Sequence, residues 1–264
     1  METLMALVYA VVGLTLIAAF TGMAMESRRP SLAGKLRAVV AVVGVLLLAV
    51  GGYIGLAVAP RDSMMGDVQR IMYVHVPAVW MALVALTVNF VASVAYMFKN
   101  SWKLDSLAEA AAEVGVLLGA NGVLLGAIWG RPTWGVWWTW DPRLTTAAIL
   151  LVAYSGYLAL RKFVEDPERR AVWSAVVGII AFVDIPILWF SVKWWRSLHQ
   201  IQSTPQTVDR PMVVPLRISA FAFLLLMIVF IWQRYRISQH ALEEEVALPD
   251  ALPPERAPRA EVTP

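Results

Sequence analysis

The chain has 264 residues, of which 59% are hydrophobic and 16% are charged, and its formal net charge is +3. An average soluble domain is only about 45–50% apolar, so this composition excludes a soluble globular protein and indicates an integral membrane protein. Cysteine is absent, which excludes disulfides, thiolate metal sites and cysteine nucleophiles, and the small net charge gives no reason to expect nucleic acid as a partner.

A membrane-spanning helix needs about 20 apolar residues, and seven segments meet or approach that length. They are residues 3–25, 36–58, 76–98, 107–129, 145–160, 171–192 and 216–233. We therefore predict an all-α, polytopic membrane helix bundle that forms a single domain over residues 1–240. Residues 241–264 include three consecutive glutamates and then a run rich in Pro and Ala, which predicts a disordered cytoplasmic tail.

The positions of Lys and Arg predict the orientation of the bundle. Four linkers, near 26–37, 99–106, 161–170 and 234–240, carry twelve basic residues, and the opposite side carries eight. The positive-inside rule places the four linkers in the cytoplasm. The first span has its positive cluster after it, so we expect it to be a retained helix with its N-terminus outside and not a cleaved signal peptide.

A tryptophan-rich stretch at residues 129–143, which we call the tryptophan segment, lies between two of the predicted spans on the outer side. It contains five of the chain's twelve tryptophans: Trp129, Trp134, Trp137, Trp138 and Trp140. Such residues commonly anchor helix ends at the membrane surface. Five of them, with Gly130 and a second glycine that let the backbone approach closely, also favour a floor for a large flat aromatic ligand. The i, i+3, i+4 spacing of Trp134, Trp137 and Trp138 predicts one face of a short surface helix.

Two of the three histidines, His75 and His199, fall at helix ends on the same outer side. Either one alone is typical of a capping or interfacial residue. Together, on the two sides of the tryptophan segment, they predict a pair of imidazoles that binds haem iron. Arg70 and Arg143 are typical of residues that contact lipid head groups, but they also suit the haem propionates.

Two carboxylates have more than one interpretation. Asp141 can pair with Arg143, accept from an indole N–H or cap the helix that follows it. Asp184 lies inside a predicted span, where a carboxylate is costly and often functional. It can equally be neutral and hydrogen-bonded to another helix, through Asn89 or Asn121, and the sequence does not decide between these roles.

The residues from Trp129 to Asp141 resemble the WWD signature of the haem-handling proteins of cytochrome c assembly. The motifs Tyr73-Val74-His75-Val76-Pro77 and Trp194-Trp195 to Leu198-His199-Gln200 resemble those of the heme exporter protein C (CcmC) family, and the similarity covers roughly residues 36–235. The resemblance implies a haem b site on the extracytoplasmic face of a bacterial inner membrane, with His75 and His199 as axial ligands. The predicted haem contacts are Trp129, Gly130, Trp134, Trp137, Trp138, Trp140, Asp141, Arg70, Arg143, Trp194 and Trp195.

The resemblance also implies partners and a role. The family presents haem to a membrane-anchored chaperone, CcmE, in a complex with the small subunit CcmD and the ABC-transporter subunits CcmA and CcmB. It would deliver haem for c-type cytochrome maturation and would not itself be an enzyme, although lyase-like assistance stays open. The family is commonly drawn with six spans, so the segment at residues 3–25 is expected to be an additional helix.

Two other functions fit parts of the sequence. A b-type cytochrome that passes electrons to quinone usually needs four histidines buried across the bilayer, whereas only two are available here. A permease subunit without a fixed haem site would use its tryptophans only as anchors. The haem content of the purified protein distinguishes these alternatives from a haem-presenting subunit.

Overall fold

The structure, a computed structural model, describes residues 2–199 and 208–251, and within these ranges all regular secondary structure is helical. Seven spans are long and apolar enough to cross a membrane, with α6 and α7 counted together, which confirms the predicted fold class. The helices are α1 (Glu2–Met25), α2 (Pro30–Tyr53), α3 (Met72–Lys99), α4 (Trp102–Trp134), α5 (Pro142–Phe163), α6 (Pro167–Phe182), α7 (Asp184–Trp194) and α8 (Arg210–Ala251). A π-helical turn (Ile54–Val58) extends α2, and a 3₁₀ helix (Asp67–Ile71) leads into α3.

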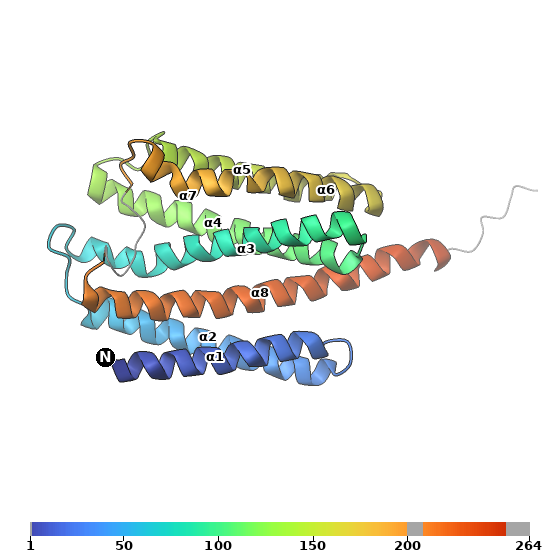
Figure 1. Cartoon of the computed structure of the whole chain (residues 1–264), viewed down its shortest axis with the longest axis horizontal. Helices are drawn as coiled ribbons and strands as arrows, with labels where there is room; N and C mark the ends of the chain where they lie inside the picture. Colours follow the sequence, from blue (N-terminus) through green and yellow to red (C-terminus); the bar gives the residue numbers. More distant parts are fainter. Residues whose placement is uncertain (1, 200–207, 252–264) are drawn as a thin grey trace, which may run out of the picture.

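The helices run along one common direction, with α3, α4 and α8 in the middle (Figure 1). Helices α1 and α2 pack on one side against α8, and α5, α6 and α7 lie on the other side. Helices α3 and α4 share the most extensive contact in the bundle, and glycines on α4 leave room for α3. A Cβ atom at Gly115 would lie 2.4 Å from Leu86 Cδ2, and one at Gly122 would lie 2.6 Å from Val79 Cγ2.

Helix α4 is longer than predicted and includes the first part of the tryptophan segment. It continues through Pro132 to Trp134 and ends at Gly135, which has a φ of 81° and donates its N–H to the Arg131 carbonyl. Such a left-handed residue is the usual helix C-terminal cap and favours glycine. The prediction that Trp134, Trp137 and Trp138 share one helical face is therefore wrong, because the helix stops before Trp137.

The sixth predicted span is broken at Val183 into α6 and α7. Pro186 has no N–H to offer the carbonyl of Phe182, four residues earlier, so a regular helix cannot continue there. Asp184 begins α7, and its Oδ2 atom is buried without a hydrogen-bond partner among the described residues. The predicted bond to an asparagine is not formed, because Asn89 donates to the Ala108 carbonyl and Asn121 is exposed.

Ion pairs join the helices at the end of the bundle opposite the tryptophan segment. Arg161 of α5 donates to both carboxylate oxygens of Asp105, at 2.7 and 2.8 Å, and to Glu109 at 3.0 Å, both on α4. Arg234 of α8 pairs with Glu113 of α4. Buried and half-buried ion pairs therefore join the helices at this end of the bundle.

Helix α8 passes the predicted domain end at residue 240 and continues to Ala251. Alanine, leucine and glutamate, which dominate residues 241–251, are good helix formers. The remainder of the predicted tail, residues 252–264, lies outside the described residues.

Candidate functional site

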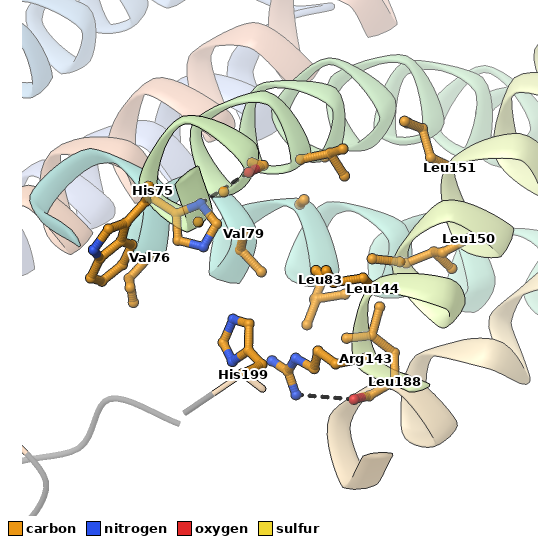
Figure 2. Close-up of a pocket in the computed structure, with 18 of the residues that line it drawn as sticks. His75, Val76, Val79, Leu83, Arg143, Leu144, Leu150, Leu151, Leu188 and His199 are labelled. Carbon is orange, nitrogen blue, oxygen red and sulfur yellow. Dashed lines mark hydrogen bonds between the residues drawn. The ribbon is translucent and has the colours of Figure 1, made fainter. Parts of the chain in front are cut away.

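A cavity of about 170 Å³ lies between α3, α4, α5 and α7 at the end of the bundle that carries the tryptophan segment. Its deeper part is apolar and is lined by leucines of α3 and α5, whereas its polar lining gathers near the helix ends (Figure 2). Seven of the predicted haem-site residues line this one cavity: His75, His199, Arg143, Trp129, Gly130, Trp134 and Trp138.

His75 lies in the first turn of α3, and only 8% of it is exposed. Its Nδ1 atom is 2.9 Å from the carbonyl oxygen of Gly122 on α4. A carbonyl can only accept, so Nδ1 carries the hydrogen and Nε2, which Figure 2 shows on the cavity side, keeps its lone pair. The ring also meets Trp129 edge-on at 5.7 Å and lies against Gly126, where a Cβ would be 3.1 Å from His75 Cε1.

His199 reaches the same cavity from the segment that follows α7. Its ring lies 6.2 Å from that of Trp134, centroid to centroid, at an angle of 60°. Figure 2 shows the two imidazoles pointing into one space from different parts of the chain. The predicted haem site needs this arrangement.

Arg143, the second residue of α5, is buried beside this space. Its Nη1 group donates to the Leu188 carbonyl at 3.0 Å and to the Trp189 carbonyl at 3.4 Å, both on α7. Arg143 and His199 both line the cavity. A cation is therefore held at the cavity wall by neutral backbone acceptors, and among the described residues no carboxylate forms a salt bridge with it, although Asp141 lies near enough to stabilise its charge.

Two indole groups of the cavity wall are buried without a hydrogen-bond partner among the described residues: Trp129 Nε1 and Trp138 Nε1. A buried N–H without an acceptor costs about 1–3 kcal/mol, so each of these two indoles has an unused donor beside the cavity. Together with Arg143, they make this wall suited to an anionic group.

Asp141 caps α5, as the sequence suggested, since its Oδ1 accepts from the Leu144 N–H at 2.9 Å. Its Oδ2 accepts from Ser197 Oγ at 2.6 Å and from the Leu198 N–H at 2.9 Å. Partial burial raises the pKa of this carboxyl, but the hydrogen bonds from Ser197, Leu144 and Leu198 outweigh it, and the pKa lies below its ordinary value. Asp141 is thus ionised at neutral pH.

The remaining predicted contacts lie outside the cavity. Arg70 donates to Asp67 at 3.0 Å and to the Gly55 carbonyl at 2.5 Å, which fixes it in the loop before α3. The other four are exposed tryptophans: Trp137, Trp140, Trp194 and Trp195. The cavity therefore does not support a direct haem contact for Arg70 or for these four indoles.

Sequence reasoning missed the glycines that shape the histidine site. Gly122 supplies the acceptor for His75, and Gly126 leaves room for its ring. The signal was present, because the α4 glycines at 115, 119, 122 and 126 are spaced by four, three and four residues, which places them on one helical face.

Comparison with known proteins places the chain in a family. The family model described as heme exporter protein C matches residues 6–248, a range that includes most of α1. The heme exporter protein C of Haemophilus influenzae is 40% identical over 222 residues, 82% of this chain and 89% of the relative. Those of Bradyrhizobium diazoefficiens (38% over 188 residues, 70% and 71%) and Escherichia coli strain K12 (36% over 199 residues, 74% and 80%) are also similar. The chain belongs to the heme exporter protein C family.

Proposed function

We propose that this chain binds haem b in the cavity at the tryptophan segment and presents it to the haem chaperone CcmE for c-type cytochrome maturation. The observation that carries the proposal is the convergence of His75 and His199 on one cavity walled by tryptophans. The relatives' name, heme exporter protein C, agrees with haem as the cargo. The family's partners, CcmD and the transporter subunits CcmA and CcmB, are proposed as partners here too.

The residues of the cavity fit the three chemical parts of haem. His75, through Nε2, and His199 would hold the haem iron, since imidazole is a common iron ligand. The flat apolar macrocycle suits Trp129, Trp134 and Trp138. The propionates suit the Arg143 guanidinium and the two indole N–H groups that have no partner among the described residues.

The roles of the protein groups follow from this geometry. The bond from His75 Nδ1 to Gly122 fixes the ring orientation and leaves Nε2 as the ligand atom. With His75 and His199 both bound to the iron, oxygen would be kept from it, which suits a carrier. Because the four exposed tryptophans lie outside the cavity, we propose that they form the docking surface for the chaperone, on the periplasmic face of the bacterial inner membrane.

Axial ligation is tested by visible spectroscopy of the detergent-purified protein titrated with haemin. The wild type is expected to bind one haem per chain and to give a low-spin, six-coordinate spectrum. His75→Ala and His199→Ala should each give five-coordinate haem or lose it. His240→Ala is the matched control, because His240 is exposed, near the end of α8, and pairs with Glu243. An unchanged bis-imidazole spectrum in either cavity variant would contradict the assignment.

The propionate contacts are tested by removing only the indole N–H. Trp129→Phe and Trp138→Phe keep an aromatic ring and lose the donor, so each should weaken haem binding by about three- to tenfold, the worth of one hydrogen bond. Trp137→Phe, at an exposed tryptophan outside the cavity, should have no effect. Haem dimethyl ester has no propionate charge. Trp129→Phe and Trp138→Phe should therefore bind the ester almost as tightly as Trp137→Phe does. If Trp129→Phe and Trp138→Phe lost as much affinity for the ester as for haem, the contact between the indole N–H groups and the propionates would be contradicted.

A further inference from the structure

We propose that Asp141 is a positioning residue whose carboxylate holds residues 197–199 so that His199 is placed at the cavity. This inference rests on the proposed function, in which His199 is an iron ligand. It replaces the direct haem contact that the sequence suggested for Asp141, since this residue does not line the cavity.

The contacts form a short chain from Asp141 to the backbone of His199. Asp141 Oδ2 accepts from Ser197 Oγ at 2.6 Å and from the Leu198 N–H at 2.9 Å. Ser197 Oγ in turn accepts from the His199 N–H at 3.0 Å. Three consecutive residues are therefore fixed, directly or through one hydroxyl, by a single carboxylate oxygen.

The other oxygen of Asp141 fixes the start of α5. Oδ1 accepts from the Leu144 N–H at 2.9 Å, and Pro142 at the first helical position pre-sets the helical backbone. Arg143, the next residue, lines the cavity. One carboxylate thus sets the position of His199 relative to Arg143, and it needs both of its oxygens to do so.

The two histidines differ in how much secondary structure holds them. His75 is inside α3 and is packed against α4, whereas His199 lies five residues beyond the end of α7. A residue outside a helix has no i to i−4 hydrogen bonds to fix its backbone. The hydrogen bonds to Asp141 take the place of helical structure for His199.

The test compares Asp141→Ala with Asp166→Ala. Asp166 caps α6 in the same way, because its carboxylate accepts from the Arg169 N–H at 2.7 Å and a proline follows it. Both variants lose a helix cap, but only Asp141 contacts residues 197–199. We expect Asp141→Ala to raise the haem dissociation constant by about tenfold, as for lost charge-assisted bonds, and to give five-coordinate haem. Added imidazole should restore the six-coordinate spectrum, and Asp166→Ala should match the wild type.

A second measurement needs no haem. The chain has no cysteine, so Leu198→Cys, at an exposed side chain, gives a single site for a nitroxide spin label. In the haem-free protein, Asp141→Ala should increase the mobility of this label, and Asp166→Ala should leave it unchanged. Ser197→Ala, which removes the hydroxyl that joins Asp141 to His199, should have an intermediate effect.

The outcomes separate the inference from the proposed function. If the label mobility of Asp141→Ala equals that of Asp166→Ala, the positioning role is refuted whatever the haem result. The same holds if added imidazole fails to restore six-coordinate haem in Asp141→Ala but restores it in His199→Ala. If the wild type binds no haem, or His199→Ala keeps its six-coordinate spectrum, the proposed function fails while the label still reports on Asp141.

Discussion

Replacing Gly126 by alanine should weaken haem binding while it strengthens the helix. The new Cβ would lie 3.1 Å from His75 Cε1 and 3.7 Å from Nδ1. Carbon atoms pack at about 3.5–4.0 Å, so the ring must move by about 0.4–0.9 Å. That movement disturbs the 2.9 Å bond from Nδ1 to Gly122, which is worth about 1 kcal/mol. We therefore expect about fivefold weaker haem binding.

Gly119→Ala is the matched control on the same helix and in the same cavity. Its Cβ would lie 3.9 Å from both Ala82 Cβ and Leu151 Cδ1, which is ordinary contact. Replacing a helical glycine by alanine stabilises each variant by about 0.5–1 kcal/mol. The unfolding temperature of Gly119→Ala should therefore be at least that of the wild type, and that of Gly126→Ala should be lower than this by the strain at His75. Haemin titration followed by absorbance, with thermal unfolding in detergent, measures the two effects. Equal haem affinity in the two variants would refute this account of His75.

Two further predictions concern charge. Because the folded-state pKa of Asp141 is lowered, the stability from its hydrogen bonds is present above its ordinary pKa of about 3.9 and is lost as the pH falls through the lowered value. The label at position 198 should thus stay immobile from pH 7 to pH 5 and become mobile only below about pH 4, and Asp141→Asn should remove this pH dependence. At the opposite end of the bundle, Arg161→Met leaves the buried Asp105 carboxylate unpaired and should lower the free energy of unfolding by about 3–5 kcal/mol. Arg61 forms an exposed pair with Asp67, so Arg61→Met should change the free energy of unfolding by less than about 1 kcal/mol. Similar decreases in the free energy of unfolding for the two variants would contradict the importance of burial.

The spans and the location of His75 and His199 at one end of the bundle could be predicted, because both depend on composition and on which side of the membrane a residue falls. Runs of apolar residues specify helices that can cross a bilayer, and alternation of the spans puts His75 and His199 at the same end of the bundle. The spans and the side of the membrane on which each histidine lies can be predicted without knowing which helices pack against each other.

Other parts depend on packing and local backbone geometry. Whether the tryptophan segment was helical was decided by the left-handed Gly135, so the spacing of its indoles predicted the wrong surface. Arg70 has the right side chain for a propionate, but Asp67 and the Gly55 carbonyl bind it. Capping α5 was one of the roles that the sequence left open for Asp141, whereas its bonds to residues 197–198 join positions more than fifty residues apart, which no local pattern reveals.

His75 and His199, on the two sides of the cavity, are not held equally firmly, because α3 packs closely on α4. The glycines at 115 and 122 bring α4 into close contact with α3, and His75 of α3 is packed against α4. His199 lies outside the helices, and the two residues before it are hydrogen-bonded to the Asp141 carboxylate. If haem binds between the two histidines as proposed, its bond to His199 would break before its bond to His75, and the haem would leave the protein from the His199 side.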